Sequence, residues 1–323
     1  MINMKINFIL PSLNPSGGVR VVKDYCTWLN EHGHDCRIYY PFIEYLKHRH
    51  KYKYAEAGLF ALGWADITIA TAWETAKTVL DLPDCCGKKA YFIQHYESLW
   101  DNRAEETYKY PLNQIVVSHW LYKTMWEKFK TSPTIVENGV FMPILYKNTT
   151  KDYISILMPH REEWWKDTRI GMKVLAAIHK QYPAVKIRVF GFRIKSPVPD
   201  YIEVYQNPTD TELKELYYDT DIFFSPSMTE GFGLPALEAM AYMCAVVTTN
   251  VGAVPEYTHH GEFAYLVHEW DFDGMYKALS YLIENPKYKI GLQVLGREYV
   301  EKRYTFDLAA KRFEQCLISL VQS

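Results

Sequence analysis

The sequence has no excess of either charge, no long apolar run and no C-x-x-C motif. Lysine and arginine (36) nearly balance aspartate and glutamate (38) to give a net charge of −2, so no global basic field favours nucleic acid. The first apolar run, residues 6–10, is too short for a secretory core or a membrane span, and no other run is long enough. Because the six cysteines accompany no export signal, reduced thiols are favoured. We expect a cytoplasmic protein with no nucleic-acid partner.

Length and composition indicate a globular protein with more than one domain. The chain has 323 residues, of which 48% are hydrophobic and 23% charged, and it contains no internal repeat or low-complexity segment. Residues 141–152, with Pro143 and a polar run over 147–152, are typical of a linker. We therefore predict one domain over residues 1–145, a second over 146–304, and a final segment over 305–323 that contains an amphipathic helix.

The most informative stretch is residues 225–238, SPSMTEGFGLPALE. It follows a short apolar run, 222–224, which predicts a buried strand, and Pro235 suits the first turn of a helix over 236–243. A glycine-bearing turn between strand and helix leaves the amides of residues 231–233 (Gly231, Phe232, Gly233) unpaired. We assign these three residues and the following Leu234 to donor binding. Free amides and the positive end of the helix dipole attract phosphate.

Two carboxylates flank this predicted phosphate site. Glu230 lies in the turn before the helix, and Glu238 lies about one turn inside it. A carboxylate only accepts hydrogen bonds, so it suits the vicinal hydroxyls of a sugar better than a phosphate. Phosphate-binding amides between two such groups predict a sugar-nucleotide site. The alternative is an ordinary strand–turn–helix unit whose glycines serve only the turn.

The spacing Glu230-x7-Glu238 within this block resembles the E-x7-E signature of retaining glycosyltransferase family 4, also described as glycosyl transferases group 1. The resemblance implies a GT-B fold, an α/β architecture in which two Rossmann-like domains face each other across a cleft. It implies an acceptor-side domain over 1–145, a nucleotide-sugar-binding domain over 146–304, and a helix in 305–323 that crosses back to the first domain. Glu230 would bind the hydroxyls of the donor sugar, and Glu238 the ribose.

Upstream positions are similar to the same family. Arg161 and Lys166 have the spacing of the two cations that hold the donor diphosphate, where negative charge builds on the leaving group. The family usually has glycine before this arginine and after this lysine, whereas His160 and Asp167 stand here, which leaves the loop path open. Met243 also replaces a usual glycine, and we expect altered packing there without loss of chemistry. Taken alone, an arginine and a lysine in a loop are usually solvated.

The neighbouring strands of the second domain extend the resemblance. Phe192, in Gly191-Phe192-Arg193, resembles the family's G-x-G strand end, with Arg193 in the region of a small residue. Gln206, at the end of the next predicted strand, stands where the family binds the base. Residues 252–256 match the family's G-x-x-P-E turn. The resemblance therefore assigns Phe192 and Gln206 to the donor site.

The first residues predict a βαβ unit of the Rossmann type. Residues 6–10 and 37–40 are predicted strands, and apolar residues at helical spacing predict a helix over 19–32 between them. The loop over 11–18 carries Gly17 and Gly18, which would let backbone approach a phosphate or the transferred sugar. In the resembling family a Gly-Gly here lies near donor and acceptor. The alternative is that both glycines only permit the turn.

Strand ends of the first domain supply three more candidates. His95, after the predicted strand 91–93, matches a position where the family often places a histidine beside the donor sugar. A neutral imidazole there can hydrogen-bond a hydroxyl or a developing charge, although a structural histidine is the alternative. Glu97, and Glu74 in a predicted strand-end loop over 71–75, are candidates for the acceptor side.

Residues 45–54 form a basic and aromatic segment. Such a segment fits peripheral contact with an anionic membrane surface or a lipid-linked acceptor, and an ordinary solvated loop is the alternative. The histidines at 48, 50, 259 and 260 have no acidic or cysteine partner at ligand spacing, so we predict no metal site.

Together these residues predict a retaining glycosyltransferase that moves a sugar from a nucleotide-diphosphate sugar to a hydroxyl. The acceptor would be a glycan, a lipid-linked molecule or a small molecule, and no cofactor or metal is expected. Retention follows from the family resemblance only. A nucleotide-sugar epimerase or phosphorylase, or a non-catalytic protein that binds a sugar nucleotide or glycan, remain alternatives. A dehydrogenase is disfavoured because the first loop lacks a full G-x-G-x-x-G.

Overall fold

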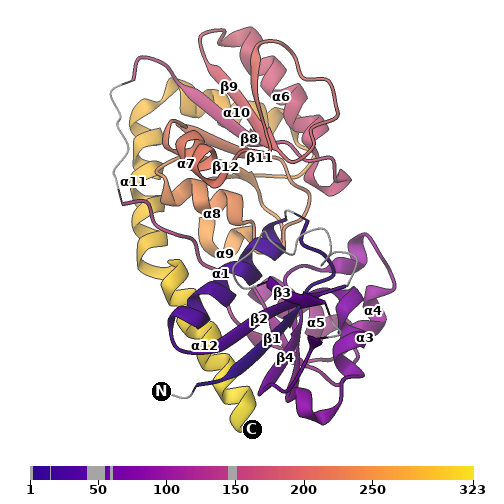
Figure 1. Cartoon of the computed structure of the whole chain (residues 1–323). Helices are drawn as coiled ribbons and strands as arrows, with labels where there is room; N and C mark the ends of the chain where they lie inside the picture. The colour runs from indigo at the N-terminus through magenta and orange to yellow at the C-terminus, as the bar shows by residue number, and fades with distance from the viewer. Residues whose placement is uncertain (1–2, 15, 42–54, 59–60, 145–150) are drawn as a thin grey trace. The chain divides into compact units, whose positions relative to one another are not determined.

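The computed structural model describes residues 3–14, 16–41, 55–58, 61–144 and 151–323. The chain divides into two compact units: unit 1 comprises residues 1–138 and 307–323, and unit 2 comprises residues 139–306. Each unit holds one parallel sheet with helices around it (Figure 1). The α/β class predicted from the sequence is therefore confirmed.

Unit 1 is built on a parallel sheet with the strand order β3-β2-β1-β4-β5-β6-β7. The order reverses at β1, which pairs with β2 on one side and with β4 on the other. This is the order of a doubly wound Rossmann-type fold. The strands are β1 (Lys5–Ile9), β2 (Asp35–Tyr40), β3 (Ala55–Gly58), β4 (Ile67–Ala70), β5 (Lys88–Ile93), β6 (Asn113–Val116) and β7 (Thr134–Ile135).

The core of unit 1 includes a helix from the far end of the chain. In α12 (Phe306–Gln322), the ring of Phe313 stacks on Tyr25 of α1 with 4.4 Å between centroids, and lies 6.0 Å from Phe8 of β1. All three rings are buried, and each contributes roughly 1.5–3 kcal/mol through burial. The remaining helices are α1 (Gly17–Glu31), α3 (Trp73–Leu80), α4 (Ala104–Thr107) and α5 (His119–Phe129), with 3-10 turns η2 (Asp84–Cys86) and η3 (Glu97–Leu99).

Unit 2 repeats the same plan with the strand order β10-β9-β8-β11-β12-β13, again all parallel. The strands are β8 (Ser155–Pro159), β9 (Lys186–Gly191), β10 (Ile202–Gln206), β11 (Ile222–Ser225), β12 (Ala245–Thr249) and β13 (Tyr265–Val267). The helices are α6 (Thr168–Gln181), α7 (Asp210–Tyr218), α8 (Leu234–Ala241), α9 (Val254–Thr258), α10 (Phe272–Glu284) and α11 (Pro286–Arg303), with the 3-10 turn η4 (Trp164–Lys166).

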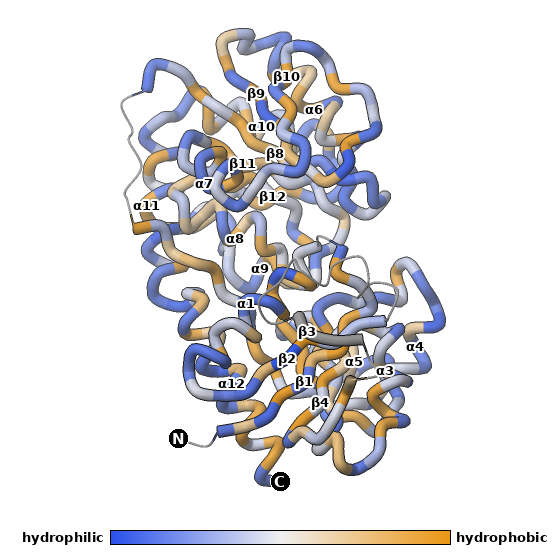
Figure 2. Tube along the Cα trace, in the orientation of Figure 1, coloured by the Kyte–Doolittle hydropathy of each residue, from blue (hydrophilic) through white to orange (hydrophobic). Residues whose placement is uncertain are grey.

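The central strands of unit 2 are apolar because both of their faces are covered. β11 and β12 are buried along their whole length, and β8 along all but its last residue. Parallel strands covered by helices on both faces have this continuous apolar character. In Figure 2 the central strands are mainly hydrophobic. The polar residues that follow them therefore lie at the edge of a rigid sheet.

Three of the differences between the predicted elements and the structure have a clear physical reason. α1 begins at Gly17 rather than at Val19, because the Ser16 hydroxyl accepts a hydrogen bond from the Val19 amide (3.2 Å) and caps the helix. The loop predicted over 71–75 is wrong, since α3 begins at Trp73. α8 begins at Leu234 rather than at 236, with Pro235 in its first turn, because proline fits that position.

Three residues take the left-handed backbone conformation where the resembling family has glycine or a small residue. Asp167 has φ 43°, Arg193 has φ 55° and Met243 has φ 56°. Aspartate tolerates this conformation, and its side chain also caps α6. Met243 follows α8 in a Schellman-type ending, in which the Cys244 amide donates to the Ala239 carbonyl (2.8 Å). Residues with side chains thus form these turns, at about 1–2 kcal/mol each for the arginine and methionine.

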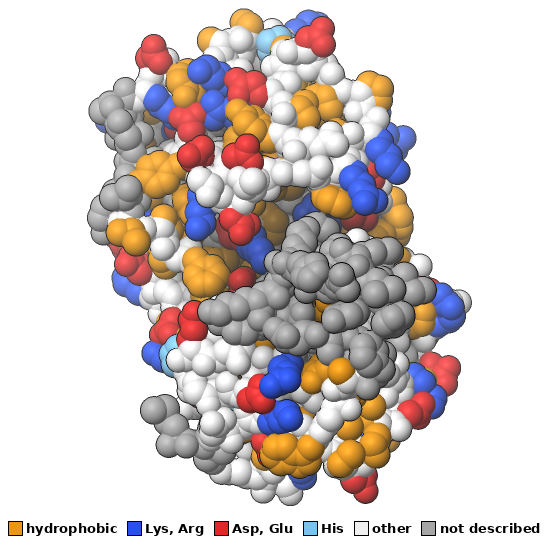
Figure 3. Space-filling model, viewed as in Figure 1, with side chains coloured by type: hydrophobic (Ala, Val, Ile, Leu, Met, Phe, Trp, Pro, Cys, Tyr) orange, Lys and Arg blue, Asp and Glu red, His pale blue; other side chains and the backbone are white. Residues whose placement is uncertain are grey.

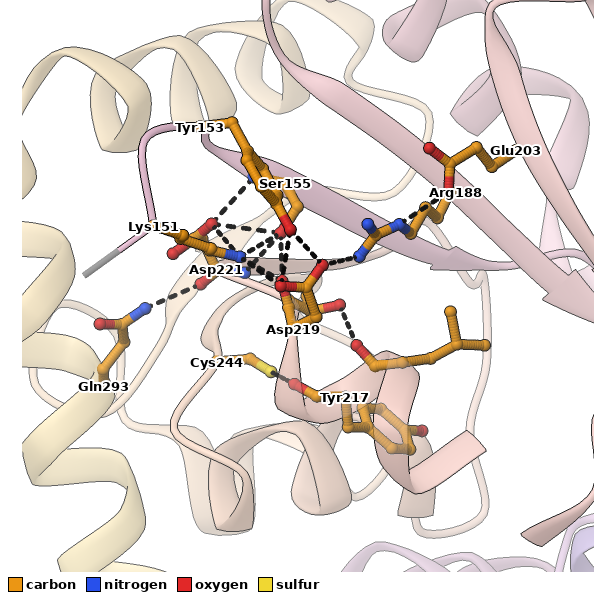
Figure 4. A network of polar contacts seen from close by, with 12 residues as sticks. Lys151, Tyr153, Ser155, Arg188, Glu203, Tyr217, Asp219, Asp221, Cys244 and Gln293 are labelled. Atoms are coloured by element: carbon orange, nitrogen blue, oxygen red, sulfur yellow. Dashed lines mark hydrogen bonds and ion pairs between the residues drawn. The ribbon is translucent and has the colours of Figure 1, made fainter. Parts of the chain in front are cut away.

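A polar network lies near the amino-terminal ends of β8, β9 and β11 (Figure 4). Asp221 accepts a hydrogen bond from the Ser155 amide (2.9 Å) and pairs with Lys151 (2.8 Å), while Asp219 pairs with Arg188. Burial raises the pKa of Asp219, but the hydrogen bonds from Arg188 and Tyr153 and the nearby positive charges together outweigh it and leave the pKa below its usual value. These charges are paired and hydrogen-bonded, which is the condition for burying them. We assign the network to holding the strands together.

The surface carries both signs of charge. On the face shown in Figure 3, basic and acidic side chains occur on each unit, in keeping with the net charge of −2. None of the helices in the described part of the chain has both the length and the apolar character that a bilayer crossing requires. The basic segment 45–54, predicted to contact a membrane or a lipid-linked acceptor, lies outside the described residues.

Candidate active site

The predicted donor residues lie at the point where the strand order of unit 2 reverses. β8 pairs with β9 on one side and with β11 on the other. Connections leave these two central strands toward opposite faces, and ligands of open α/β sheets bind in the crevice beyond such strand ends. β8 leads into His160 and Arg161, and β11 leads into the turn that carries Glu230. The fold therefore brings the two motifs together although they are far apart in sequence.

The loop after β8 is held by its own hydrogen bonds and by the neighbouring turn. The Thr168 hydroxyl accepts from the Arg161 amide (3.0 Å) and donates to the Arg161 carbonyl (2.6 Å). The Met228 amide, in the turn after β11, donates to the Trp165 carbonyl (2.7 Å). Lys166 follows directly, so its backbone has a fixed position relative to that turn.

Lys166 and Glu230 form an ion pair across these two loops. The distance from Lys166 Nζ to Glu230 Oε1 is 2.7 Å, and the side chains are only 24% and 13% exposed. A partly buried, hydrogen-bonded pair is stronger than one in bulk water because the local dielectric is lower. Lys166, one of the two cations predicted to bind the diphosphate, thus lies beside Glu230, the carboxylate predicted to bind the sugar.

The turn from Glu230 to Gly233 depends on two close backbone approaches. Gly252, with φ 55°, lies so close that a Cβ there would be 1.9 Å from the Glu230 carbonyl oxygen, and the Ala253 amide donates to that oxygen (3.3 Å). Gly233, with φ 89°, is the N-cap of α8, and the Tyr257 hydroxyl donates to its carbonyl (2.9 Å). These contacts fix the turn that presents Glu230.

The start of α8 retains free donors. Among the described residues, the amides of Phe232 and Gly233 have no hydrogen-bond acceptor. They directly precede Leu234, the first residue of α8. Unpaired amides at the positive end of a helix are suited to an anion. The expected phosphate-binding chemistry is therefore available here.

Glu238 is oriented by a residue that the sequence did not suggest. The Tyr217 hydroxyl, on α7, lies 3.0 Å from Glu238 Oε2 and donates to it. The Tyr217 side chain is almost fully buried, so its hydroxyl approaches the Glu238 carboxylate from the protein interior. The sequence likewise did not suggest the role of Tyr257, which is buried and contacts Gly233. Burial, followed by the charge of Glu230, raises the pKa of Tyr257, so its hydroxyl stays a donor at neutral pH.

The other donor-site candidates of unit 2 lie at the same edge of the sheet. His160 is buried, and burial lowers its pKa, so a neutral imidazole adjoins Arg161 at neutral pH. Phe192 follows β9, with the Arg193 guanidinium 4.8 Å from its ring centroid. Gln206 ends β10 and is exposed. Phe192 and Gln206 lie one and two strands away from β8, respectively. Among the described residues, neither of them contacts the Lys166–Glu230 pair.

In unit 1, Gly17 and Gly18 open α1 beyond the end of β1. The Gln94 side chain, after β5, donates to the Gly18 carbonyl (3.2 Å), and a Cβ on Gly18 would come within 3.1 Å of that side chain. The absence of a side chain at Gly18 thus allows this close packing.

The His95 ring is half-buried and lies edge-on to Trp100, with 5.2 Å between centroids.

Glu97 is tied to the start of α3, and Glu74 is exposed in the first turn of that helix. Glu97 Oε2 accepts hydrogen bonds from the Trp73 amide (2.9 Å) and the Tyr91 hydroxyl (2.7 Å). Burial raises the pKa of Glu97 to about 8, although both hydrogen bonds act in the opposite direction. Glu97 therefore has a structural role, and its acceptor-side role stays a prediction.

The raised pKa of Glu97 predicts a pH-dependent stability. The folded state keeps a proton on Glu97 up to about pH 8, whereas an unfolded chain loses it near 4.5. Stability contributed by this group is therefore complete below about pH 4.5 and falls as pH rises toward 8, by about 1.4 kcal/mol per pH unit at most. Glu97→Gln imitates the protonated form and is expected to flatten this fall in urea unfolding between pH 5 and 8. Parallel curves for the two proteins would contradict the assignment.

The four histidines at which we predicted no metal site are described only in part. His48 and His50 lie outside the described residues. His259 Nδ1 lies 3.7 Å from Glu262, and His260 Nδ1 accepts a hydrogen bond from the Leu266 amide (3.0 Å). Metal independence stays a prediction.

The part of the chain that carries this site resembles a known protein family. Residues 146–293 match the family model described as Glycosyl transferases group 1. This segment is therefore similar to that family over a little less than half of the chain. The family segment contains the Arg161, Lys166, Glu230 and Glu238 positions, and the resemblance seen in the sequence is confirmed.

Curated relatives match over parts of their length. The capsular polysaccharide biosynthesis glycosyltransferase CapM of Staphylococcus aureus is 27% identical over 121 residues, which is 36% of this chain and 32% of CapM. The MMP alpha-(1->4)-mannosyltransferase of Mycolicibacterium hassiacum is 35% identical over 91 residues, 28% of this chain and 22% of that enzyme. The chain thus aligns with less than half the length of either relative.

Solved structures are similar over the whole chain. HepE of Anabaena, in complex with UDP-glucose, superposes with a TM-score of 0.82 at 15% identity, covering 98% of this chain and 100% of HepE. Sucrose-phosphate synthase of Thermosynechococcus elongatus gives a TM-score of 0.78 at 16% identity, with 98% of both chains covered. At this identity the likeness shows the fold, and the predicted GT-B fold class is confirmed.

Proposed function

We propose that this chain transfers a sugar from a nucleotide-diphosphate sugar to a hydroxyl acceptor, with retention of configuration and without a metal. The observation that carries the proposal is the Lys166–Glu230 pair, 2.7 Å apart at the reversal point of the unit 2 sheet. A ligand that satisfies both groups offers an acceptor to the lysine and a donor to the carboxylate side by side, as the phosphate and sugar hydroxyls of a nucleotide-diphosphate sugar do. The match of residues 146–293 to the family model of glycosyl transferases group 1 supports this choice.

Each group has a distinct role in the proposed reaction. Arg161 and Lys166 neutralise the diphosphate as the glycosidic bond breaks, while the amides of Phe232 and Gly233 donate to a phosphate oxygen. Glu230 accepts from hydroxyls of the sugar, and Glu238 from the ribose. The leaving phosphate itself takes the proton of the acceptor hydroxyl. His95, Glu74, Glu97 and Gly17–Gly18 remain candidates for the sugar and acceptor sides.

Uridine is the first base to test. HepE, which shares the fold, has been solved with UDP-glucose and also with UDP and glucose. A ligand that binds only the folded state raises its melting temperature. We therefore expect UDP or a UDP-sugar to stabilise the chain in the presence of EDTA, when UDP, GDP, dTDP and ADP are compared.

Variants decide whether this stabilisation arises at the proposed site. Arg161→Ala and Glu238→Ala are expected to abolish the ligand-induced shift, whereas Glu215→Ala, which removes an exposed carboxylate on α7, should keep it. Product analysis then separates transfer from epimerisation, which changes the donor without consuming an acceptor. A shift that appears only with added divalent metal would contradict metal independence. No shift from any nucleotide would favour a non-catalytic glycan-binding protein.

A further inference from the structure

α11 carries an apolar stripe on the face that it does not bury. Ile290, Val294 and Leu295 are 48%, 37% and 45% exposed, and Gly291 lies among them. Residues three and four apart on a helix are neighbours, so these four share one face. The opposite face of α11 packs on α8 and β12. In Figure 1 the helix lies at the margin of unit 2.

Charges of opposite sign bound the stripe at its two ends. Lys287 lies about one turn before Ile290, and Glu298 lies about one turn after Val294, and both charged side chains are exposed. Spacings of three to four residues place both on the face of the stripe. A helix face with a cation at one end and an anion at the other is complementary to a second copy that runs in the opposite direction.

The complementarity extends through the whole stripe. If two copies of α11 cross antiparallel about the midpoint between residues 292 and 293, the facing pairs are Lys287 with Glu298, Ile290 with Leu295, and Gly291 with Val294. Opposite charges then meet at both ends. Apolar side chains meet inside them, and the glycine lets the two helices approach closely at the centre. A twofold interface requires this kind of self-complementarity, because each surface meets a copy of itself.

We propose that α11 is a self-association surface, through which two copies of this chain pair with their α11 helices antiparallel. A membrane is a poorer occupant, because membrane-surface helices carry mainly lysine and arginine on their polar flanks, whereas this stripe is bounded by both signs. Ile144 is 95% exposed in the segment next to α11, where the Arg297 side chain donates to the Pro143 carbonyl (3.2 Å), and it enlarges the apolar area. The stripe has far fewer residues than the roughly 20–30 that each side of a standard interface contributes, so we expect a weak and reversible dimer.

Charge reversal tests the pairing directly. Sedimentation velocity of the full chain between 1 and 100 µM, on the order of the range for weak dimers, should show dimer formation. Lys287→Glu and Glu298→Lys each place like charges at both ends and are expected to weaken the dimer about tenfold or more. A mixture of these two variants should dimerise again, since each mixed pair restores opposite charges. The double variant should also recover, and Lys214→Glu, on the exposed face of α7, should behave as wild type.

Other results would overturn the proposal. A wild-type chain that stays monomeric throughout this range, or a dimer that both single reversals leave unchanged, rules out pairing through α11. Val294→Glu, checked for folding by circular dichroism, should also weaken the dimer. If the wild type is monomeric and co-sediments with anionic vesicles, and Val294→Glu removes that binding, the stripe is a membrane contact instead.

Discussion

Replacing Glu230 by glutamine is expected to lower the rate of sugar transfer by about 100-fold or more while the chain stays folded. The Glu230 carboxylate is 13% exposed and lies 2.7 Å from Lys166 Nζ. In the proposed role it holds donor hydroxyls next to the bond that breaks, where a preorganised group typically contributes about 10²–10³ in kcat. Lys166→Met is expected to act similarly, because it removes a cation that stabilises the leaving diphosphate. The measurement is the rate of transfer from the donor that the nucleotide screen identifies.

A structural role for this ion pair predicts a different pattern. Both side chains are mostly buried, so each single variant leaves one charge without its partner and should cost roughly 2–3 kcal/mol of stability. The double variant Lys166→Met/Glu230→Gln leaves neither charge without a partner, and it should regain most of that stability. It should regain none of the activity. If activity returned with stability, the pair would only hold the loops together, and the assigned roles would be wrong. Glu163→Gln, an exposed carboxylate in the same loop, is the matched control.

Much of unit 2 could be predicted from the sequence because its signals are local. Apolar runs such as 222–224 end at glycine- or proline-bearing turns, and their strands lie within one or two residues of the expected bounds. Alternation of strands and helices then leaves few topologies, and the reversal point follows from the strand order. The proximity of Lys166 and Glu230 was expected only through the family resemblance, since no local pattern relates residues so distant in sequence.

The groups that the sequence did not suggest are distant along the chain from the residues that they contact. Tyr217 and Tyr257 contact Glu238 and Gly233 from other helices, and a buried tyrosine has the same sequence pattern whether it orients a carboxylate or fills the core. Such a contact depends on the three-dimensional packing. The start of α3 was missed for a related reason, because the carboxylate that accepts from its first amide belongs to Glu97, outside the helix.

At Met243, where we expected altered packing, and at Asp167 and Arg193, the departures from the family concern backbone conformation. Asp167, Arg193 and Met243 all have positive φ angles, so their positions need the left-handed conformation whatever residue occupies them. A sequence shows only that glycine is missing and cannot show the φ angle. The glycine that remains at 252 is different, because its lack of a side chain is needed for space as well as for conformation.

Gly252→Ala is therefore expected to destabilise the chain more than a glycine substitution that has a conformational cost alone. The φ angle of Gly252 is 55°, and an added Cβ would lie 1.9 Å from the carbonyl oxygen of Glu230. That oxygen belongs to the backbone, so the clash is relieved only if the Glu230 turn moves. We expect a loss of about 2–4 kcal/mol, which combines the conformational cost with a displaced turn. The same movement should abolish nucleotide-induced stabilisation.

Gly261→Ala separates these two causes within the same unit. Gly261 has φ 79°, but the nearest atom to an added Cβ is the Tyr288 hydroxyl at 3.6 Å, an ordinary contact. This variant has the conformational cost alone, about 1–2 kcal/mol, and should still respond to nucleotide. Melting temperatures with and without UDP would compare the two. Equal stability and equal nucleotide response in both variants would show that the Gly252 turn does not hold Glu230 in place. A folded Gly252→Ala variant without nucleotide response would show that the position of this turn, rather than the overall fold, controls binding.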